Sequence, residues 1–301
     1  MQEVQPTGYM QPLVSPERGA TSAVTDDQLI AVWIETYRDA SPHTIVLYER
    51  VARRFVAALH LAGHTFASAT LEQTQAAVET LRFMESGGPA LPATVATYID
   101  AVRLFFNFAH RVGFTRFNAG PLTRSPRVPS MLAQRILSEF DVGLLLRAAR
   151  PGRDDAILSI GYYGGLRISE IAGLRWSNVI ARDSGEAQLD VIGKGGKVRQ
   201  VLLPAELAKK LVALRCDAPA DAPIFRISTR QMRAIVLATA RRAGLTGNIS
   251  PHWLRHAHAS HALDNHAPIS LVQATLGHAS LSTTSAYVHA RPGDSSSRYL
   301  K

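Results

Sequence analysis

Apolar residues recur every three or four positions over most of this 301-residue chain, and this spacing restricts the fold more than any other feature. The spacing is typical of amphipathic helices, which bury one apolar stripe. Over residues 24–116 no segment alternates long enough to predict a strand, and Gly-Gly-Pro at 87–89 separates two helices. We therefore predict an all-helical domain of four or five helices over residues 24–118. Its clearest apolar runs are Tyr48, Val51, Phe55 and Leu59, and Tyr98, Val102, Phe105 and Ala109.

One segment, residues 187–203, has the pattern of a β-hairpin. Leu189 and Val191 alternate with polar neighbours, a glycine-rich turn follows at 193–196, and an apolar run continues from Val198 to Leu203. Helical patterns fill most of the remaining sequence after Ser138, which is a good N-cap residue. The predicted fold class is mainly α, with a small antiparallel β-sheet in the second, helix-rich domain.

Proline and glycine divide the chain. Residues 1–23 have no apolar periodicity and predict a flexible tail, and residues 119–136 begin with a stretch that holds three prolines and two serines and predict a linker. The second domain then spans 137–301, in keeping with about 150 residues per domain. The linker either follows a phosphate backbone or is a plain tether.

Charge is concentrated in the second part of the chain. Of 33 Lys and Arg and 24 Asp and Glu, residues 1–120 hold 9 and 11, which leaves 24 basic and 13 acidic groups for residues 121–301. The net charge of +9 favours a polyanionic partner, with nucleic acid first and an anionic membrane second, although basic side chains also serve simply to solvate a surface.

Several protein classes are excluded on composition. Cys216 is the one cysteine, so no internal disulfide forms, and a reducing, cytoplasmic location is expected. No apolar run approaches the roughly 20 residues that cross a bilayer. The N-terminus lacks the basic and apolar regions of a secretion signal.

A cluster of histidines follows Ser250 and Pro251, which predict a helix start. His252 and Arg255 lie three residues apart, where free backbone N–H groups and the helix dipole favour a phosphate. A purely structural role is the more common explanation for such a pair. A zinc site formed by His252, His256, His258 and His261 is a weaker alternative, because the His-Glu-x-x-His pattern is absent and the nearest carboxylate is Asp264. We expect no metal and no other cofactor.

Three further places carry groups suited to phosphate chemistry. Arg167 and Glu170 follow Gly164-Gly165, either as an exposed ion pair or as a phosphate-binding arginine with a supporting carboxylate. Lys194 lies at the predicted hairpin tip, where it either aids solubility or enters a site. His278 follows a helix end at Gly277, and Ser282-Thr283-Thr284 offers an N-cap for a short helix that carries Tyr287.

In this order the residues resemble the active-site set of the tyrosine recombinases, the phage integrase family with its Xer-like members. The matching segments are GLRISEIAGLRW at 165–176, IGKGGKVR at 192–199, HWLRHAHASHAL at 252–263 and LGHASLSTTSAYVH at 276–289. Residues 94–118 also resemble the end of that family's helical, SAM-like core-binding domain, and the resemblance covers about 26–290.

The resemblance implies a site-specific DNA recombinase that works without metal or ATP. It makes Tyr287 the nucleophile that forms a 3′-phosphotyrosyl bond, with Arg167, Arg255 and His278 as stabilisers of negative charge. It also makes His252 the assisting base, Lys194 the acid for the 5′-oxygen and Glu170 a supporting residue.

The resemblance further implies a tetramer on two double-stranded DNA sites, with accessory DNA-bending factors in some relatives. It places Arg230, Arg233, Arg241 and Arg242 at the DNA. Many relatives dock a C-terminal helix on the neighbouring protomer, and Ser295 to Lys301 is short for that purpose.

Two alternatives share much of this evidence. A DNA-binding protein that keeps the fold without turnover is disfavoured because all six chemical groups are present. A type IB topoisomerase uses the same phosphotyrosine chemistry, and the short chain and the N-terminal helical domain disfavour it.

Overall fold

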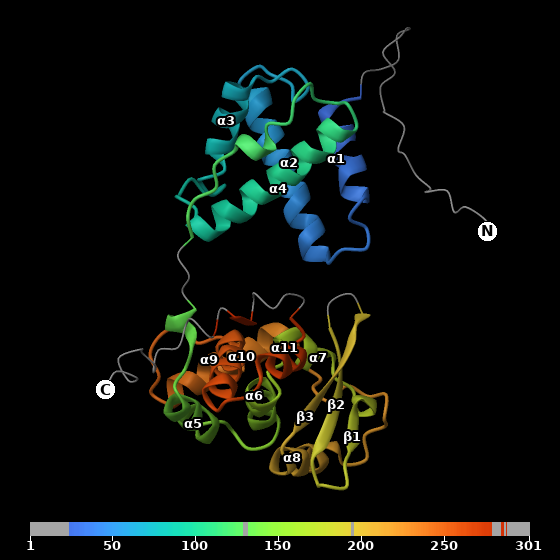
Figure 1. Ribbon diagram of the computed structural model, residues 1–301, viewed down its shortest axis with the longest axis vertical. Coiled ribbons are helices and arrows are strands. Elements are labelled where there is room, and N and C mark those ends of the chain that lie inside the picture. The colour runs from blue at the N-terminus through green and yellow to red at the C-terminus, as the bar shows by residue number, and fades with distance from the viewer. Residues whose placement is uncertain (1–23, 129–131, 194–195, 279–283, 286, 288–301) are drawn as a thin grey trace, which may run out of the picture. The chain divides into compact units, whose positions relative to one another are not determined.

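The computed structural model describes residues 24–128, 132–193, 196–278, 284, 285 and 287. The predicted tail, Lys194, Ser282, Thr283 and residues 295–301 lie outside these residues. The chain divides into two compact units, residues 1–129 and 130–301, each with its own core (Figure 1). The boundary falls inside the stretch predicted as a linker.

The N-terminal unit is all helical in its described part, as predicted. Its aromatic core includes Trp33, Phe55, Phe66, Phe105 and Phe106, which lie up to 73 positions apart in the sequence and touch ring to ring. Residues 119–123, which open the predicted linker, pack on this core, because Ala119 is fully buried and Arg103 donates to the Thr123 carbonyl. The helices are α1 (Asp26–Glu35), α2 (Pro42–Leu61), α3 (Leu71–Thr80), α4 (Pro92–Arg111) and the 3-10 turn η1 (Gly120–Leu122).

The C-terminal unit combines helices with one small sheet (Figure 1). The predicted N-cap is confirmed, since the Ser138 hydroxyl accepts from the Asp141 N–H. The predicted helix end is also confirmed at Gly277, which has a left-handed backbone with φ 64°. The elements are η2 (Ala133–Arg135), α5 (Glu139–Arg147), α6 (Arg153–Tyr163), α7 (Ile168–Gly173), η3 (Trp176–Asn178), β1 (Val179–Ala181), β2 (Ala187–Ile192), β3 (Val198–Leu203), α8 (Ala205–Arg215), α9 (Thr229–Arg242), α10 (Pro251–Asp264) and α11 (Ile269–Leu276).

The predicted hairpin is confirmed and gains a third strand. The order is β1-β2-β3, all antiparallel, and β2 pairs with β3 from Ala187–Leu203 to Ile192–Val198. Side chains of opposed residues share a face, so Arg199 of β3 lies on the same face as its partner Val191, which is buried. An arginine therefore occupies an inward position of the sheet.

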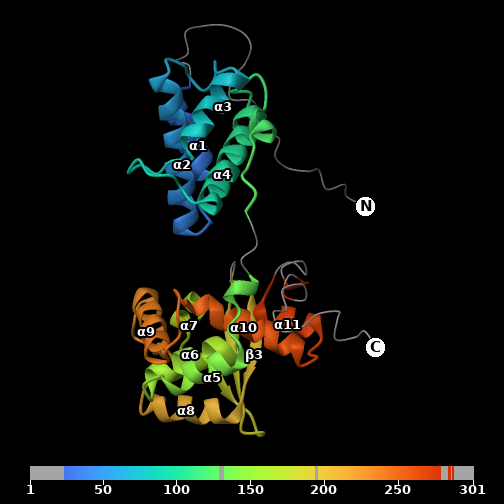
Figure 2. The same ribbon diagram turned by 90° about the vertical axis from the view of Figure 1, so that its left-hand side faces the viewer.

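Helices α6 and α10 pack together at the centre of the C-terminal unit (Figure 2). Gly161 permits their close approach, because a Cβ atom there would lie 3.3 Å from Leu254 Cδ1. This contact fixes α10, the helix of His252, Arg255 and His256, in the core.

No helix in the part of the chain that the structure describes has the length and apolarity to span a membrane.

Gly165 makes the turn between α6 and α7 so tight that only glycine fits. Its φ is +60°, and a Cβ atom would lie 2.8 Å from the His258 ring and 2.9 Å from Leu276. Such contacts demand that the packed neighbours move.

We expect Gly165→Ala to lower the free energy of unfolding by about 2–4 kcal/mol, through left-handed strain and overpacking. Gly173→Ala is the matched control, because no atom lies within 4 Å of its added methyl. Denaturant unfolding measures both, and equal effects of the two changes would contradict this account.

Candidate active site

Glu170 is a buried carboxylate that binds two guanidinium groups. Its Oε1 accepts from Arg167 Nη1 and Arg199 Nη1, each at 2.9 Å, and its Oε2 accepts from Arg199 Nη2 at 2.8 Å. The Arg167 backbone N–H also donates to Oε2, at 2.8 Å. Burial alone would raise the pKa of Glu170, but hydrogen bonds from Arg199 and Arg167 and the charge of Arg199 lower it overall. The carboxylate is therefore ionised at neutral pH and fixes Arg167 at the start of α7.

Arg199 is the site residue that the sequence prediction missed. Its Nε donates to the Thr275 carbonyl at 2.7 Å, which joins β3 to the last turn of α11. The sequence did indicate this position, because alternation along β3 places Arg199 on the same face as the buried Val201 and Leu203. An inward arginine in a strand needs a buried partner, and here Glu170 is that partner.

Arg255 is almost completely buried, with 4% of its surface exposed. Its Nη1 donates to the Gly165 carbonyl at 2.5 Å and its Nη2 to the Leu276 carbonyl at 2.7 Å. Burial, followed by the charge of Arg167, lowers the pKa of Arg255 to about 10. The guanidinium remains charged at neutral pH and is held in a single orientation by two backbone carbonyls.

Tyr287 is buried beside this cationic group. Its hydroxyl lies 2.7 Å from His256 Nδ1, and its ring is nearly parallel to that of His278, at 5° with centroids 6.3 Å apart. Burial raises the pKa of Tyr287, and the charges of Arg255 and Arg167 partly oppose the rise. Those two charges therefore act directly on the phenolic oxygen.

His278 directly follows Gly277 and bonds to Thr284. Its Nδ1 lies 2.9 Å from the Thr284 hydroxyl, which is fully buried. Burial, and then the charges of Arg255 and Arg167, lower the pKa of His278 to about 4. The imidazole is therefore neutral at pH 7, and its other ring nitrogen is the one directed away from Thr284.

The remaining histidines of α10 have different surroundings. His252 is exposed overall and has no hydrogen bond to any described residue. Partial burial of its ring, and then the charges of Arg255 and Arg167, lower its pKa. His258 Nδ1 bonds to the Tyr162 carbonyl and His261 Nε2 to the Leu137 carbonyl, at 2.7 and 2.9 Å. Within the described ranges, no three His, Cys, Asp or Glu side chains gather as a metal site would require.

The structure thus brings together Arg167, Glu170, Arg255, His278 and Tyr287 of the predicted set. Lys194 falls outside the described residues. The four arginines predicted to contact DNA lie exposed on α9, namely Arg230, Arg233, Arg241 and Arg242. Arg233 is near enough to lower the pKa of His252, whereas Arg242 donates to the Ala148 carbonyl and the Thr239 hydroxyl.

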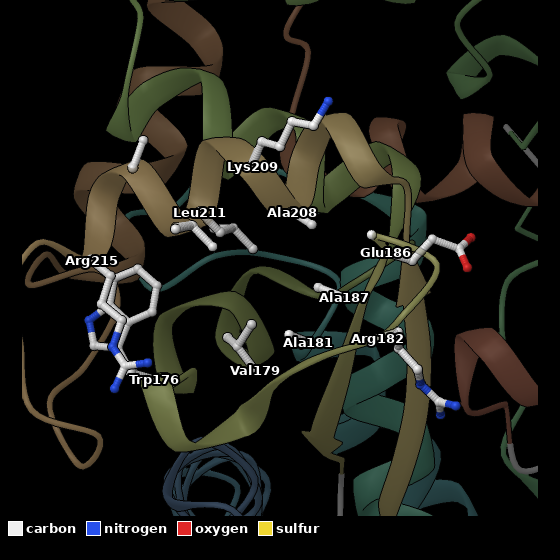
Figure 3. A pocket seen from close by; sticks show the side chains of 13 residues that line it. Trp176, Val179, Ala181, Arg182, Glu186, Ala187, Ala208, Lys209, Leu211 and Arg215 are labelled. Carbon is white, nitrogen blue, oxygen red and sulfur yellow. The ribbon is translucent and has the colours of Figure 1, made fainter.

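A separate hollow of about 440 Å³ lies between α8 and the β1–β2 turn (Figure 3). Apolar side chains such as Val179 and Leu211 line it, and the charged ends of Lys209 and Glu186 point away from its centre. None of the residues described above for the site lines this hollow. Arg182, Lys209 and Arg215 are the basic residues of its lining, which contains no histidine, serine or tyrosine.

We expect Glu170→Gln to lower the free energy of unfolding by about 3 kcal/mol at pH 7, because it leaves Arg199 and Arg167 without their anion. The folded-state pKa of Glu170 is lower than its ordinary 4.5, so the contribution of the carboxylate is complete above pH 4.5 and is lost as the pH falls further. The stability gap between wild type and variant should close in that acid range. Urea unfolding from pH 7 to pH 3 tests this, and a constant gap would contradict it.

Comparison with known proteins shows what this chain is similar to. The phage integrase family model matches residues 134–293. Tyrosine recombinase XerC of Pelobacter propionicus is 32% identical over 269 residues, or 85% of this chain and 87% of the relative. Tyrosine recombinase XerD of Brucella suis is 33% identical over 280 residues, which cover 84% of this chain and 88% of the relative.

Solved structures of recombinases have the same fold. XerH site-specific recombinase bound to palindromic difH substrate matches with a TM-score of 0.67 and 20% identity, over 89% of this chain and 82% of that chain. A lambda integrase dimer bound to a COC′ core site matches with a TM-score of 0.65 and 16% identity, over 88% of this chain and 78% of that chain. These likenesses confirm the predicted fold class, and with the sequence matches they establish that the chain belongs to the phage integrase family, together with the XerC and XerD tyrosine recombinases.

Proposed function

We propose that this protein is a site-specific DNA recombinase that cuts and rejoins strands through a bond between Tyr287 and a DNA 3′ phosphate. One observation carries the proposal: a buried tyrosine hydroxyl lies in the field of Arg255 and Arg167, whose guanidinium groups are held by hydrogen bonds to the Gly165 carbonyl and to Glu170. Family membership supports the same activity. XerH and lambda integrase are both described bound to DNA sites, which supports double-stranded DNA as the partner.

The fixed cations suit the transition state of phosphoryl transfer. When the phenolic oxygen attacks phosphorus, negative charge builds on the non-bridging oxygens. Arg167 and Arg255 meet that charge without reorganisation, because their partners already hold them in place. Neutral His278 lies with Nδ1 2.9 Å from the Thr284 hydroxyl, and in the tautomer that accepts there its Nε2–H would be a third donor. Donors of this kind each contribute about 3–4 kcal/mol.

The leaving group also needs a proton. The bond between phosphorus and the 5′-oxygen breaks as the phosphotyrosyl bond forms, and by resemblance Lys194 protonates that oxygen. The covalent bond conserves the phosphodiester, so rejoining needs no ATP. By the same resemblance, recombination uses four such exchanges within a tetramer on two duplexes, and accessory DNA-bending factors are compatible with it. A cytoplasmic location fits this activity.

Tyr287→Phe should bind DNA and form no covalent adduct, because the attacking oxygen is gone and the ring packing remains. The measurement uses nicked duplexes built on a sequence that the wild-type chain selects from a random duplex library. Denaturing gels and peptide mapping then locate any adduct. An adduct formed by the variant, or a wild-type adduct on another residue, would overturn the proposed nucleophile.

Raising salt should weaken DNA binding steeply, since each phosphate contact releases counterions. Arg233 is exposed on α9 near His252, so Arg233→Ala should make the log–log salt slope less steep by about 1. Arg242→Ala is the matched control on the same helix, because Arg242 already bonds to Ala148 and Thr239 and should change the slope less. Fluorescence anisotropy across a salt series measures the slopes, and a salt-independent wild type would contradict the electrostatic part of the proposal.

A further inference from the structure

The hydroxyl of Tyr287 contacts a histidine that the resemblance leaves without a role. Its hydrogen-bond partner in the described structure is His256 Nδ1, at 2.7 Å. His252, to which the resemblance gives the role of base, lies one helical turn earlier and has no hydrogen bond to a described residue. The rings of the two histidines lie 6.3 Å apart. Of the two candidates for the base, His256 therefore contacts the phenol and His252 does not.

The surroundings of His256 keep its ring neutral. Burial lowers its pKa to about 4, and the charges of His252 and Arg255 on α10 and of Arg135 in η2 contribute in the same direction. Two further titratable groups lie near the ring, Tyr287 itself and His278, whose own pKa is lowered by the charge of His256. No carboxylate forms an ion pair with His256 among the described residues, so nothing there favours the imidazolium. At neutral pH the ring holds a lone pair within reach of the phenol.

Tyr287 needs such a group. An ordinary phenol has a pKa near 10, and burial raises that of Tyr287, so the free phenolate is scarce at pH 7. The oxygen must lose its proton as it bonds to phosphorus. A base that is already in hydrogen-bond contact can take that proton during the attack, without prior formation of the phenolate.

We propose that His256 is a further catalytic residue, whose Nδ1 accepts the phenolic proton of Tyr287 while that oxygen attacks phosphorus. This inference rests on the proposed function. In the step, the bond from Tyr287 Oη to phosphorus forms and the bond from phosphorus to the 5′-oxygen breaks. The phenolic proton moves to His256, and the 5′-oxygen takes its proton from Lys194. Rejoining reverses each transfer, so that His256 returns the proton to the departing phenolic oxygen.

The energetics require that the transfer accompany the attack. In the free protein the proton stays on Tyr287, because the pKa of the phenol is far above that of His256. Once Oη is bonded to phosphorus it becomes an ester oxygen, which no longer holds a proton. The negative charge that develops on the phosphate also offsets the cationic neighbours of the new imidazolium.

The first test is the variant His256→Asn, whose amide reaches the position of Nδ1 but is not basic. Single-turnover adduct formation on the selected nicked duplex should fall about 10²-fold at pH 7. Without a base, the reaction depends on the phenolate, whose fraction rises tenfold per pH unit. The deficit against wild type should therefore shrink by about tenfold per pH unit between pH 6 and pH 9. A deficit that is absent or constant over this range would overturn the inference.

Two matched variants on α10 separate this role from a structural one. His258→Asn also removes an imidazole, one that bonds to the Tyr162 carbonyl and not to Tyr287. Its rate relative to wild type should not change with pH, whatever its stability. His252→Asn should likewise lack the pH-dependent recovery, and recovery in that variant but not in His256→Asn would assign the base to His252.

A measurement on the wild-type chain without DNA keeps the inference testable if His256→Asn fails to fold. Nitrogen NMR of ¹⁵N-histidine should show His256 neutral at pH 7, protonated at Nε2, and titrating near pH 4. A proton on Nδ1 would overturn the inference. The adduct assay also distinguishes failure of this inference from failure of the proposed function. If Tyr287 carries the DNA but the His256→Asn deficit is constant with pH, the recombinase function stands and only the role of His256 is wrong.

Discussion

The carboxylate of Glu170 allows two guanidinium groups to occupy one small volume. Arg199 is mostly buried and Arg167 is partly exposed, and their charges would repel each other without an anion between them. Because each Glu170 oxygen accepts two hydrogen bonds, the carboxylate fixes the directions of both guanidinium groups as well as their charge. The electric field at Tyr287 therefore depends on Glu170, although Glu170 forms no hydrogen bond with Tyr287.

The end of α11 is the second point of attachment. The last carbonyls of a helix lack partners within it and carry partial negative charge. Thr275 and Leu276 offer two such carbonyls, which accept from Arg199 and Arg255. The site arginines thus also satisfy the helix end, and Gly277 turns the chain at that point so that His278 follows directly. The same hydrogen bonds therefore stabilise the end of α11 and hold the site arginines in position.

Much of this arrangement was predictable from the sequence, because it depends on local signals. The hairpin follows from the alternation around Leu189 and Val191 and the glycine-rich turn after it, and the end of α11 follows from Gly277. The burial of Arg199 was predictable in principle from its inward position in β3. The partner of Tyr287 was not predictable, because His252 and His256 are four residues apart and face the same side of α10. Which of them meets the phenol depends on where the segment around residue 287 packs, and this is a tertiary property.

Burial then determines how the site uses charge. Histidines are often taken as cations at a phosphate site, but burial and the nearby arginines keep His256 and His278 neutral. The fixed positive charge comes from Arg167 and from Arg255, and Arg255 remains protonated at neutral pH although burial lowers its pKa to about 10. The imidazoles are therefore free for hydrogen bonding and proton transfer, one at the phenol and one beside Thr284. In the proposed reaction, Arg167, Arg255 and the His278 donor would stabilise the anionic transition state, and His256 would move the phenolic proton, so that neither task disturbs the other.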